Sequence, residues 1–260
     1  MVAGIDIGSV TAKTVILDQK KQIVGYSVVE EGLVNEESAI VSMRQALEKA
    51  GLSQEDVKFV VTTGYGRNLV HFQDKSFSEI SSHAKGAHFL VPQVRTIIDI
   101  GGQDSKVISL NGEGKIETFQ MNDKCAAGTG RFLEVMSRAL KLSFSEMGKL
   151  GALSQHPSHV SSMCTVFAES EIISLAAQGI PKTDIIAGLY ESIARRTLML
   201  MGMIQVRPKV VMTGGVAKNR QLVKVLEAVI KEEIVVPPEP QIVGALGAAL
   251  MAYQAMAGEA

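Results

Sequence analysis

The chain has 260 residues, of which 46% are hydrophobic and 20% charged, with a formal net charge of −1. This composition is ordinary for a folded domain or two modest lobes, and a near-neutral charge without a Lys/Arg block gives no electrostatic case for nucleic acid. No apolar run reaches the roughly 18 residues of a membrane span, the start "MVAGIDIGSV" lacks a signal-peptide pattern, and two cysteines 39 positions apart do not indicate a disulfide framework, so we expect a cytoplasmic protein.

The first half of the chain predicts three strands, a helix, a short strand and a second helix. Residues 5–17 read "IDIGSVTAKTVIL", a strand, a glycine-bearing turn and a strand, and lead into the alternating stretch "KQIVGYSVVEEG". Residues 35–50 carry apolar residues at helical spacing and stop at Gly51. A strand is predicted near 58–63, running into "VTTGYGRN", and a helix near 78–90.

The second half repeats this order. Residues 98–110, "IDIGGQDSKVISL", match residues 5–17 at a constant offset of 93, and "GKIETFQ" follows as a third strand. "VMTGGVAKN" at 211–219 repeats the Thr-Gly ending of "VTTGYGRN". Asp6 lies 58 residues before its Thr-Gly glycine and Asp99 lies 115 before its own, so the second half holds 57 additional residues, which include both cysteines. Two motif pairs in the same order indicate an internal duplication.

The remaining pattern alternates strands and helices. Further helices are predicted near 129–141, 165–178, 183–204, 218–231 and 243–256, and further strands near 95–100, 209–213 and 233–236. We predict an α/β protein of two similar lobes around a cleft, each built from a βββαβα unit. Lobe I comprises residues 1–93, with the C-terminal helix (about 244–260) packing back on it, and lobe II comprises residues 94–243 with both cysteines.

Each repeat places an aspartate at a strand end, directly before a glycine turn. Backbone amides in such a turn can approach an anion closely because glycine has no Cβ. Two such turns facing each other predict a phosphate site gripped from both sides, with Asp6 and Asp99 holding Mg²⁺ mostly through waters. Lys13 and Lys106 also fit exposed positions on their strands, and for Lys106 we favour that interpretation.

Both cysteines precede predicted helices. Cys125 lies before "AAGTGRFLEVMSRAL", where Thr129 is the expected N-cap, and Cys164 opens "TVFAESEIISLAAQ". Helix N-termini favour negative charge, so both thiols are placed to ionise or to ligate a metal. Ordinary buried cysteines are the alternative interpretation.

The histidines offer a third interpretation of the cysteines. His156 and His159 precede Cys164 and would complete a zinc site with Cys125, although Pro157 between the two histidines favours a loop. The other histidines show no partner pattern and fit surface or helix-face positions; they are His71, His83 and His88.

Several motifs resemble those of a known ATPase superfamily. "IDIGSVTAK", "IDIGGQD" and "VMTGGVAKN" resemble the two phosphate motifs and the adenosine motif of the actin, hexokinase and heat-shock-chaperone ATPases. More narrowly, "TGYGRN", "DIGGQDSK", "NDKCAAGTGRFLEVM", "CTVFAESE" and "GGVAKN" resemble the activator (component A) family of 2-hydroxyacyl-CoA dehydratases and related ATP-dependent iron–sulfur reductases of the BadF/BadG type. The resemblance covers nearly the whole chain and implies actin-like lobes around a nucleotide cleft.

The resemblance also implies the residues of an ATP site. Ser9–Lys13 would contact the phosphates, and the turn at Gly101–Asp104 would meet the γ-phosphate and the attacking water. Gln103 is our choice for orienting that water, because an amide both donates and accepts hydrogen bonds, and Asp104 is the rival. The implied cofactor-binding residues are Asp6, Gly8, Ser9, Val10, Thr11, Ala12, Lys13, Asp99, Gly101, Gly102, Gly214, Gly215, Val216, Asn219 and Gln241.

The resemblance also implies a shared iron–sulfur cluster for the cysteines. A [4Fe–4S] cluster takes four thiolates, one chain offers two, and the resemblance implies that Cys125 and Cys164 of a homodimer hold one cluster together. ATP would drive low-potential electrons from ferredoxin or flavodoxin to a partner iron–sulfur enzyme, either a dehydratase or a double-cubane cluster protein. The motifs do not identify that acceptor or an acyl-CoA.

Two other functions fit the same lobes. A small-molecule kinase would use Asp104 to take a hydroxyl proton from its substrate, but it gives the thiols no role. A nucleotide-gated binding module would only change shape.

Overall fold

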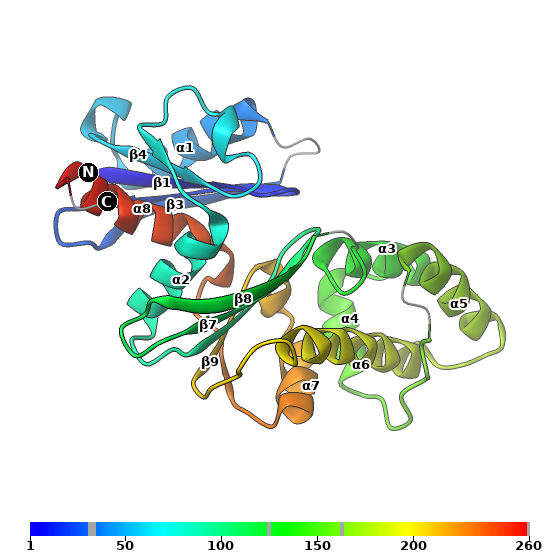
Figure 1. Ribbon diagram of the computed structural model, residues 1–260. Helices are drawn as coiled ribbons and strands as arrows, with labels where there is room; N and C mark the ends of the chain where they lie inside the picture. Colours follow the sequence, from blue (N-terminus) through cyan, green and yellow to red (C-terminus); the bar gives the residue numbers. More distant parts are fainter. Residues whose placement is uncertain (31–34, 124–125, 162–163, 259–260) are drawn as a thin grey trace.

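The computed structural model describes residues 1–30, 35–123, 126–161 and 164–258. Within these ranges the strands form two five-stranded sheets, one in each half of the chain (Figure 1). All the predicted helices are present, and their observed ends lie within three residues of the predicted ones. Across the described ranges, no helix is both long and apolar enough to cross a membrane.

The two sheets have the same topology. Their strand orders are β3-β2-β1-β4-β5 and, read from the other edge, β8-β7-β6-β9-β10. The first three strands of each sheet are antiparallel neighbours, and the fourth joins in parallel. The predicted duplication is therefore confirmed. The strands are β1 (Val2–Ile7), β2 (Thr11–Leu17), β3 (Ile23–Glu30), β4 (Val60–Thr63), β5 (Lys75–Ser76), β6 (Thr96–Ile100), β7 (Ser105–Leu110), β8 (Ile116–Asn122), β9 (Val210–Thr213) and β10 (Ile234–Val235).

The helices begin and end at residues that suit those positions. The first helix illustrates this: Asn35 accepts a hydrogen bond from the amide of Ser38 at 3.1 Å, and Gly51 closes the helix with φ of 66°. The helices are α1 (Glu36–Ala50), α2 (Glu79–Leu90), α3 (Gly130–Leu140), α4 (Phe144–Gly151), α5 (Thr165–Ala177), α6 (Lys182–Met201), α7 (Arg220–Ile230) and α8 (Val243–Met256).

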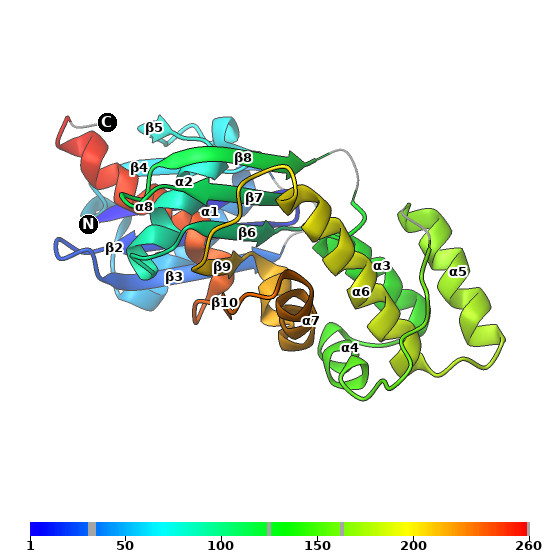
Figure 2. The same ribbon diagram turned by 60° about the horizontal axis from the view of Figure 1, so that its bottom comes forward.

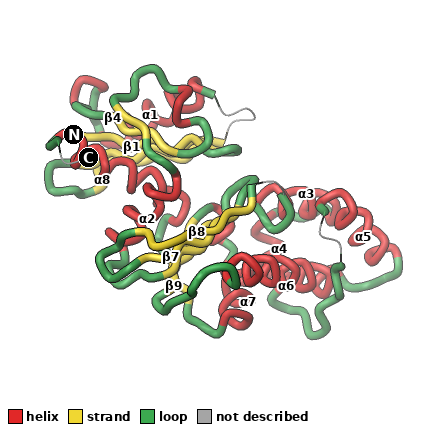
Figure 3. Tube along the Cα trace, viewed as in Figure 1, coloured by secondary structure: helices red, strands yellow, loops and turns green. Residues whose placement is uncertain are grey.

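The additional residues of the second half form α3, α4 and α5. These helices lie between β8 and α6 in the chain and extend away from the two sheets, with α5 at the far end of the molecule from the termini (Figures 2 and 3). Helix α4 was not predicted, although Ser143 and Glu146 form a capping box at its start. The insertion is thus a helical unit attached to one lobe only.

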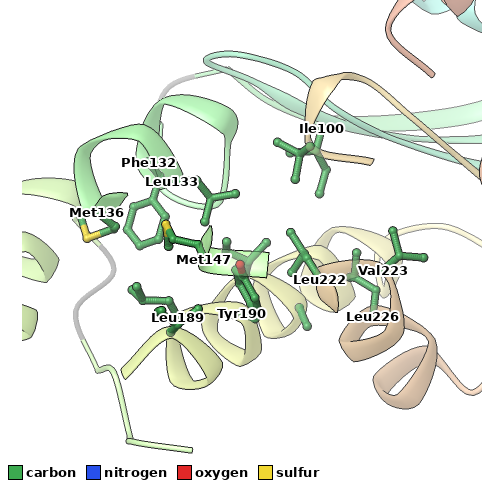
Figure 4. Packing of buried hydrophobic residues seen from close by; sticks show 14 of the residues in the cluster. Ile100, Phe132, Leu133, Met136, Met147, Leu189, Tyr190, Leu222, Val223 and Leu226 are labelled. Carbon is green, nitrogen blue, oxygen red and sulfur yellow. The ribbon is translucent and has the colours of Figure 1, made fainter. Parts of the chain in front are cut away.

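The largest buried cluster lies between the second sheet and the helices α3, α4, α6 and α7. Figure 4 shows Ile100 of β6 at one side of this cluster and Phe132, Met147 and Tyr190 at its centre. The hydroxyl of Tyr190 accepts a hydrogen bond from Asn219 Nδ2 at 2.8 Å. Burial raises the pKa of Tyr190 to about 12, so the phenol stays protonated in this core.

Helices α2 and α8 cross between the two sheets with their backbones in contact (Figure 1). Helix α8 covers the first sheet, while Ile80 and Ala84 of α2 contribute to a core on the second sheet. A Cβ on Gly247 would lie 1.8 Å from the carbonyl oxygen of Ser82, and a Cβ on Gly86 would lie 2.2 Å from that of Val243. Only glycine therefore fits at this crossing.

We predict that Gly247→Ala lowers the free energy of unfolding by at least about 2 kcal/mol, because the new methyl group would enter the backbone of α2. Urea unfolding followed by circular dichroism measures this. Gly148→Ala is the matched control, because it also lies inside a helix but its Cβ would meet nothing nearer than 3.5 Å. That variant should gain up to about 1 kcal/mol from helix propensity. Equal stabilities of the two variants would contradict the packing described here.

Candidate functional site

The first glycine turn is held by an ion pair between neighbouring strands. Asp6 on β1 is the register partner of Lys13 on β2, and Lys13 Nζ lies 3.1 Å from Asp6 Oδ2. The amide of Gly8 donates to the carbonyl of Thr11 at 3.0 Å, which closes the turn. A Cβ on Gly8 would lie 2.9 Å from Lys13 Nζ. The ammonium group therefore lies directly beside the turn, where an anion could reach it.

The second turn repeats this arrangement. Asp99 on β6 is the register partner of Lys106 on β7, with Lys106 Nζ 3.2 Å from Asp99 Oδ2. The amide of Gly101 donates to the carbonyl of Asp104 at 3.0 Å. The two predicted phosphate turns thus share the same backbone hydrogen bond and the same Asp–Lys pair.

Lys106 differs from its counterpart in its surroundings. Its side chain is only 2% exposed, and its Nζ also lies 2.7 Å from Asp104 Oδ2 and 3.5 Å from Glu79 Oε2. Burial alone would lower the pKa of Lys106, but Asp99, Asp104 and Glu79 together raise it above its usual range. The expected exposed position of Lys106 is therefore wrong: α2 covers this part of β7, and three carboxylates offset the cost of burying the charge.

Asp99 is the most strongly held carboxylate of the site. The hydroxyl of Thr213 donates to Asp99 Oδ1 at 2.8 Å, and His83 Nδ1 lies 3.6 Å from the same oxygen. Burial alone would raise the pKa of Asp99, but His83, Lys106 and the Thr213 hydrogen bond hold it well below its usual range. The carboxylate is therefore ionised whenever the protein is folded near neutral pH.

His83 links the two halves of the site. Its Nδ1 lies 3.2 Å from Thr213 Oγ1, on the Asp99 side. On the other side, a Cβ on Gly244 of α8 would lie 3.0 Å from His83 Nε2 and 3.1 Å from Asp6 Oδ2. The imidazole thus lies between the two aspartates, in room that Gly244 provides.

Sequence analysis missed the contribution of α2 to this site. His83 lies on a helix face, as expected, but the face is buried and its partners were not foreseen. Glu79 was not considered, and burial raises its pKa while Lys106 lowers it, with a net upward shift. The signal was present in the sequence, because a spacing of four residues places Glu79 and His83 on one face of a helix.

The two turns contact one another. A Cβ on Gly102 would lie 2.4 Å from Val10 Cγ2 and 3.3 Å from Ser9 Oγ. Thr11 and Ala12 follow at the start of β2. The fold therefore brings together the predicted phosphate motifs of the two halves.

The predicted adenosine motif follows β9. Gly214 has φ of 87°, and a Cβ on Gly215 would lie 3.0 Å from Gln241 Nε2, so these residues lie together. Val216 and Asn219 are 2% and 4% exposed. The side chain of Asn219 accepts from the amide of Leu222 as the N-cap of α7 and donates to Tyr190, so it has a local structural role.

Cys164 is an exposed free thiol at the N-cap position of α5, whereas Cys125 lies outside the described residues. Thr129 is the N-cap residue of α3, as predicted, but its hydroxyl donates to the carbonyl of Ala126 at 2.5 Å instead of accepting from a helix amide. In the part of the chain that the structure describes, no group of three or more His, Cys, Asp or Glu residues could hold a metal ion. His156 and His159 therefore do not form a zinc site with Cys164 alone.

The second turn is hydrogen-bonded to the helical insertion. The amide of Gly130 donates to the carbonyl of Gly101 at 2.9 Å, and the amide of Arg131 donates to the carbonyl of Gly102 at 2.7 Å. These are the first two residues of α3. A movement of the turn would therefore be transmitted to α3 directly.

We predict that Lys106→Met lowers the free energy of unfolding by about 3–5 kcal/mol at pH 7, because it leaves three carboxylates without their cation. Without the cation the folded-state pKa values of these carboxylates rise above their unfolded values. The variant should therefore regain stability relative to the wild type as the pH falls from 8 to 5. Urea unfolding across this range measures it. Lys115→Met, at an exposed ion pair with Glu113, should change little at any pH.

Comparison with known proteins places this chain in a family. The chain matches the BadF/BadG/BcrA/BcrD ATPase family over residues 3–252. It is 50% identical over 252 residues to the activator of lactoyl-CoA dehydratase from Anaerotignum propionicum, with 97% of each chain covered. It is 49% identical over 252 residues to the (R)-2-hydroxyglutaryl-CoA dehydratase activating ATPase of Acidaminococcus fermentans, with 96% of each chain covered.

A solved structure supports the same assignment. The activator of the 2-hydroxyisocaproyl-CoA dehydratase from Clostridium difficile, with bound ADPNP, is 45% identical with a TM-score of 0.94, covering 99% of this chain and 96% of that chain. The predicted actin-like α/β fold of two lobes is confirmed. This chain belongs to the BadF/BadG/BcrA/BcrD ATPase family.

Proposed function

We propose that this protein is the ATP-dependent activator of a 2-hydroxyacyl-CoA dehydratase, which couples ATP binding and hydrolysis to low-potential electron transfer to that partner iron–sulfur enzyme. The observation that carries the proposal is the pair of hydrogen bonds from Gly130 and Arg131 of α3 to the second turn. They connect a site built for a nucleoside triphosphate to the insertion that carries the cysteines. Similarity to two dehydratase activators over nearly the whole chain supports the choice of partner.

The two turns would bind the triphosphate. Lys13 lies beside the first turn and would neutralise phosphate charge, while Asp6 and Asp99, buried at the ends of their strands, would hold Mg²⁺ through its waters. The adenosine would lie against the glycines after β9, beside Gln241. The full proposed contact set is Asp6, Gly8, Ser9, Val10, Thr11, Ala12, Lys13, Asp99, Gly101, Gly102, Gly214, Gly215, Val216, Asn219 and Gln241.

Gln103 would orient the attacking water. Its side chain is exposed on the second turn. Asp104, the rival, is paired with Lys106 at 2.7 Å, and turning it towards a water would remove one of the three carboxylates that offset the burial of this cation. We therefore assign Asp104 to holding the turn and Gln103 to the water, since an amide can accept from the water and donate to the phosphate.

The conformational change would pass from the turn to the insertion. We take lobe I as residues 1–93 with α8 and lobe II as residues 94–243, with α2 and α8 crossing between them. A turn that closes on the γ-phosphate would move the carbonyls of Gly101 and Gly102, and α3 would follow because its first two amides are bonded to them. Helix α5 packs on α3 and would move with it.

The cysteines would hold the electron carrier. Cys164 is exposed at a helix N-terminus, where negative charge is favoured, and a thiolate suits an iron–sulfur cluster. With Cys125, which lies outside the described residues, one chain supplies two of the four thiolates, so a homodimer would share one [4Fe–4S] cluster. When bound, the cluster supplies one-electron transfer. Ferredoxin or flavodoxin would be the donor, in the cytoplasm.

The kinase alternative has less support. It gives no role to Cys164, and the similar activators are named for dehydratase activation. A double-cubane cluster protein as acceptor is the nearer alternative, and an assay with purified acceptor enzymes distinguishes the two.

We expect Gln103→Ala to lower the turnover of ATP hydrolysis by about 100-fold while the dissociation constant for a non-hydrolysable ATP analogue stays unchanged. Asp104→Asn is the contrast, because it should lower the melting temperature by weakening the ion pair with Lys106. Steady-state phosphate release and thermal unfolding measure the two effects. If Gln103→Ala hydrolyses ATP at the wild-type rate, we would conclude that Asp104 orients the water.

Anaerobically purified wild-type protein should contain about four irons and four acid-labile sulfides per dimer. Cys164→Ala should lose both and still bind ATP, because α5 lies outside the nucleotide turns. Ser170→Ala, also on exposed α5, is the control and should retain the iron. Iron and sulfide analysis with EPR after reduction decides this. Wild-type protein that stays free of iron after reconstitution but hydrolyses ATP would argue for the kinase alternative.

A further inference from the structure

Thr63 has a buried hydroxyl without a hydrogen-bond partner. The residue is 0% exposed, and within the described ranges its Oγ1 is the buried side-chain polar atom that no group satisfies. An unpaired buried hydroxyl carries the full cost of losing water. Such a group in a native structure calls for an explanation, and a partner that it meets in another state of the molecule is one.

The internal duplication identifies the partner. Thr63 is the register partner of Asp6 across β1 and β4, as Thr213 is of Asp99 across β6 and β9. Register partners on adjacent parallel strands project from the same face, about 5 Å apart. In the second half the hydroxyl of Thr213 donates to Asp99 Oδ1 at 2.8 Å. Thr63 is therefore placed to donate to Asp6 in the same way.

The backbone after each threonine supports this equivalence. Gly64 and Gly214 both have a left-handed conformation, with φ of 88° and 87°. A Cβ on Gly64 would lie 2.4 Å from Asp6 Oδ1, and a Cβ on Gly214 would lie 2.9 Å from Asp99 Oδ1. In both halves the chain thus passes directly beside a carboxylate oxygen on leaving the strand.

The difference between the halves lies in the lysines. Lys13 is within hydrogen-bond distance of Asp6 Oδ2, at 3.1 Å, and lies beside the first turn. Lys106 is instead enclosed by Asp99, Asp104 and Glu79. An arriving phosphate can therefore draw Lys13 away from its aspartate, whereas Lys106 remains in place. Asp6 would then lose its partner, and Thr63 is the neighbouring donor.

We propose that Thr63 is a positioning residue that donates a hydrogen bond to Asp6 in the nucleotide-bound state, after Lys13 has turned to the phosphates. The inference rests on the proposed ATP site. Thr63 would hold the Asp6 carboxylate in place towards the hydrated Mg²⁺, as Thr213 holds Asp99. The exchange moves no proton between groups, because Lys13 stays charged and the hydroxyl keeps its hydrogen.

The test compares Thr63→Val with Thr213→Val and Thr63→Ser, using a non-hydrolysable ATP analogue as the probe. Valine has nearly the shape of threonine but no hydroxyl. Thermal unfolding of the nucleotide-free proteins is measured first, and analogue affinity with and without Mg²⁺ is then measured by calorimetry.

Thr63→Val should melt at or above the wild-type temperature without nucleotide, because no hydrogen bond is lost. It should bind the Mg²⁺-analogue about tenfold more weakly, which is the effect of one hydrogen bond to a charged group. The loss should shrink when Mg²⁺ is withheld, and Thr63→Ser should restore affinity. Thr213→Val should melt at a lower temperature in both states, because its bond to Asp99 is present throughout.

Two outcomes would overturn the inference alone. Thr63→Val with a lowered melting temperature in the absence of nucleotide would show that the hydroxyl already has a partner. Wild-type affinity for the Mg²⁺-analogue in Thr63→Val would show that no bond forms on binding. A wild-type protein that binds no analogue would overturn the inference together with the proposed function, so the failures are distinguishable.

Discussion

The ion pair between Asp99 and Lys106 lies where β6, β7 and α2 meet, and its burial constrains the structure around it. An ammonium group in such a position needs opposite charges close by, since breaking a buried pair costs several kcal/mol. Asp104 supplies one from the second turn, and Glu79 supplies another from the first residue of α2. The second turn is therefore held in position by the protein's own charges. The first turn has a similar pair, Lys13 with Asp6, but Lys13 is more exposed than Lys106.

The crossing of α2 and α8 determines how closely the two halves approach. Because Gly86 and Gly247 lack side chains, the two helix backbones touch, and the sheets that they cover are brought together. Gly244 has a second effect, since its missing Cβ leaves room for His83 between Asp6 and the Asp99 side of the site. The imidazole of His83 on α2 therefore lies between Asp6 and Asp99, the two aspartates at equivalent positions of the duplicated halves. The contact between α2 and α8 therefore both packs small residues together and positions the charged groups of the site.

The duplication has produced two halves that differ in what they can do. The first half has Lys13 paired with Asp6 beside its turn, and the hydroxyl of Thr63 on β4 has no partner among the described residues. The second half has a fully partnered aspartate and carries α3, α4 and α5 on a turn bonded to α3 through Gly101 and Gly102. In the proposed activator, the first half would respond to phosphate and the second would transmit the response towards Cys164. The division of labour follows from the partners of each residue, since the backbones are alike.

Local properties of the sequence were sufficient for the duplicated strand-turn-strand units, for all the long helices and for placing Asp6 and Asp99 on equivalent strands. Strand alternation, helical spacing and glycine turns act over a few neighbours. They were insufficient for α4, which has only eight residues, and for β5, which has only two. They also misplaced Lys106 and gave no role to Glu79 and His83. The burial of these residues depends on α2 folding across β7 and β9, and their partners come from segments far away in the chain. The tertiary packing decides which charges are buried together, because the elements that cover a side chain determine its surroundings.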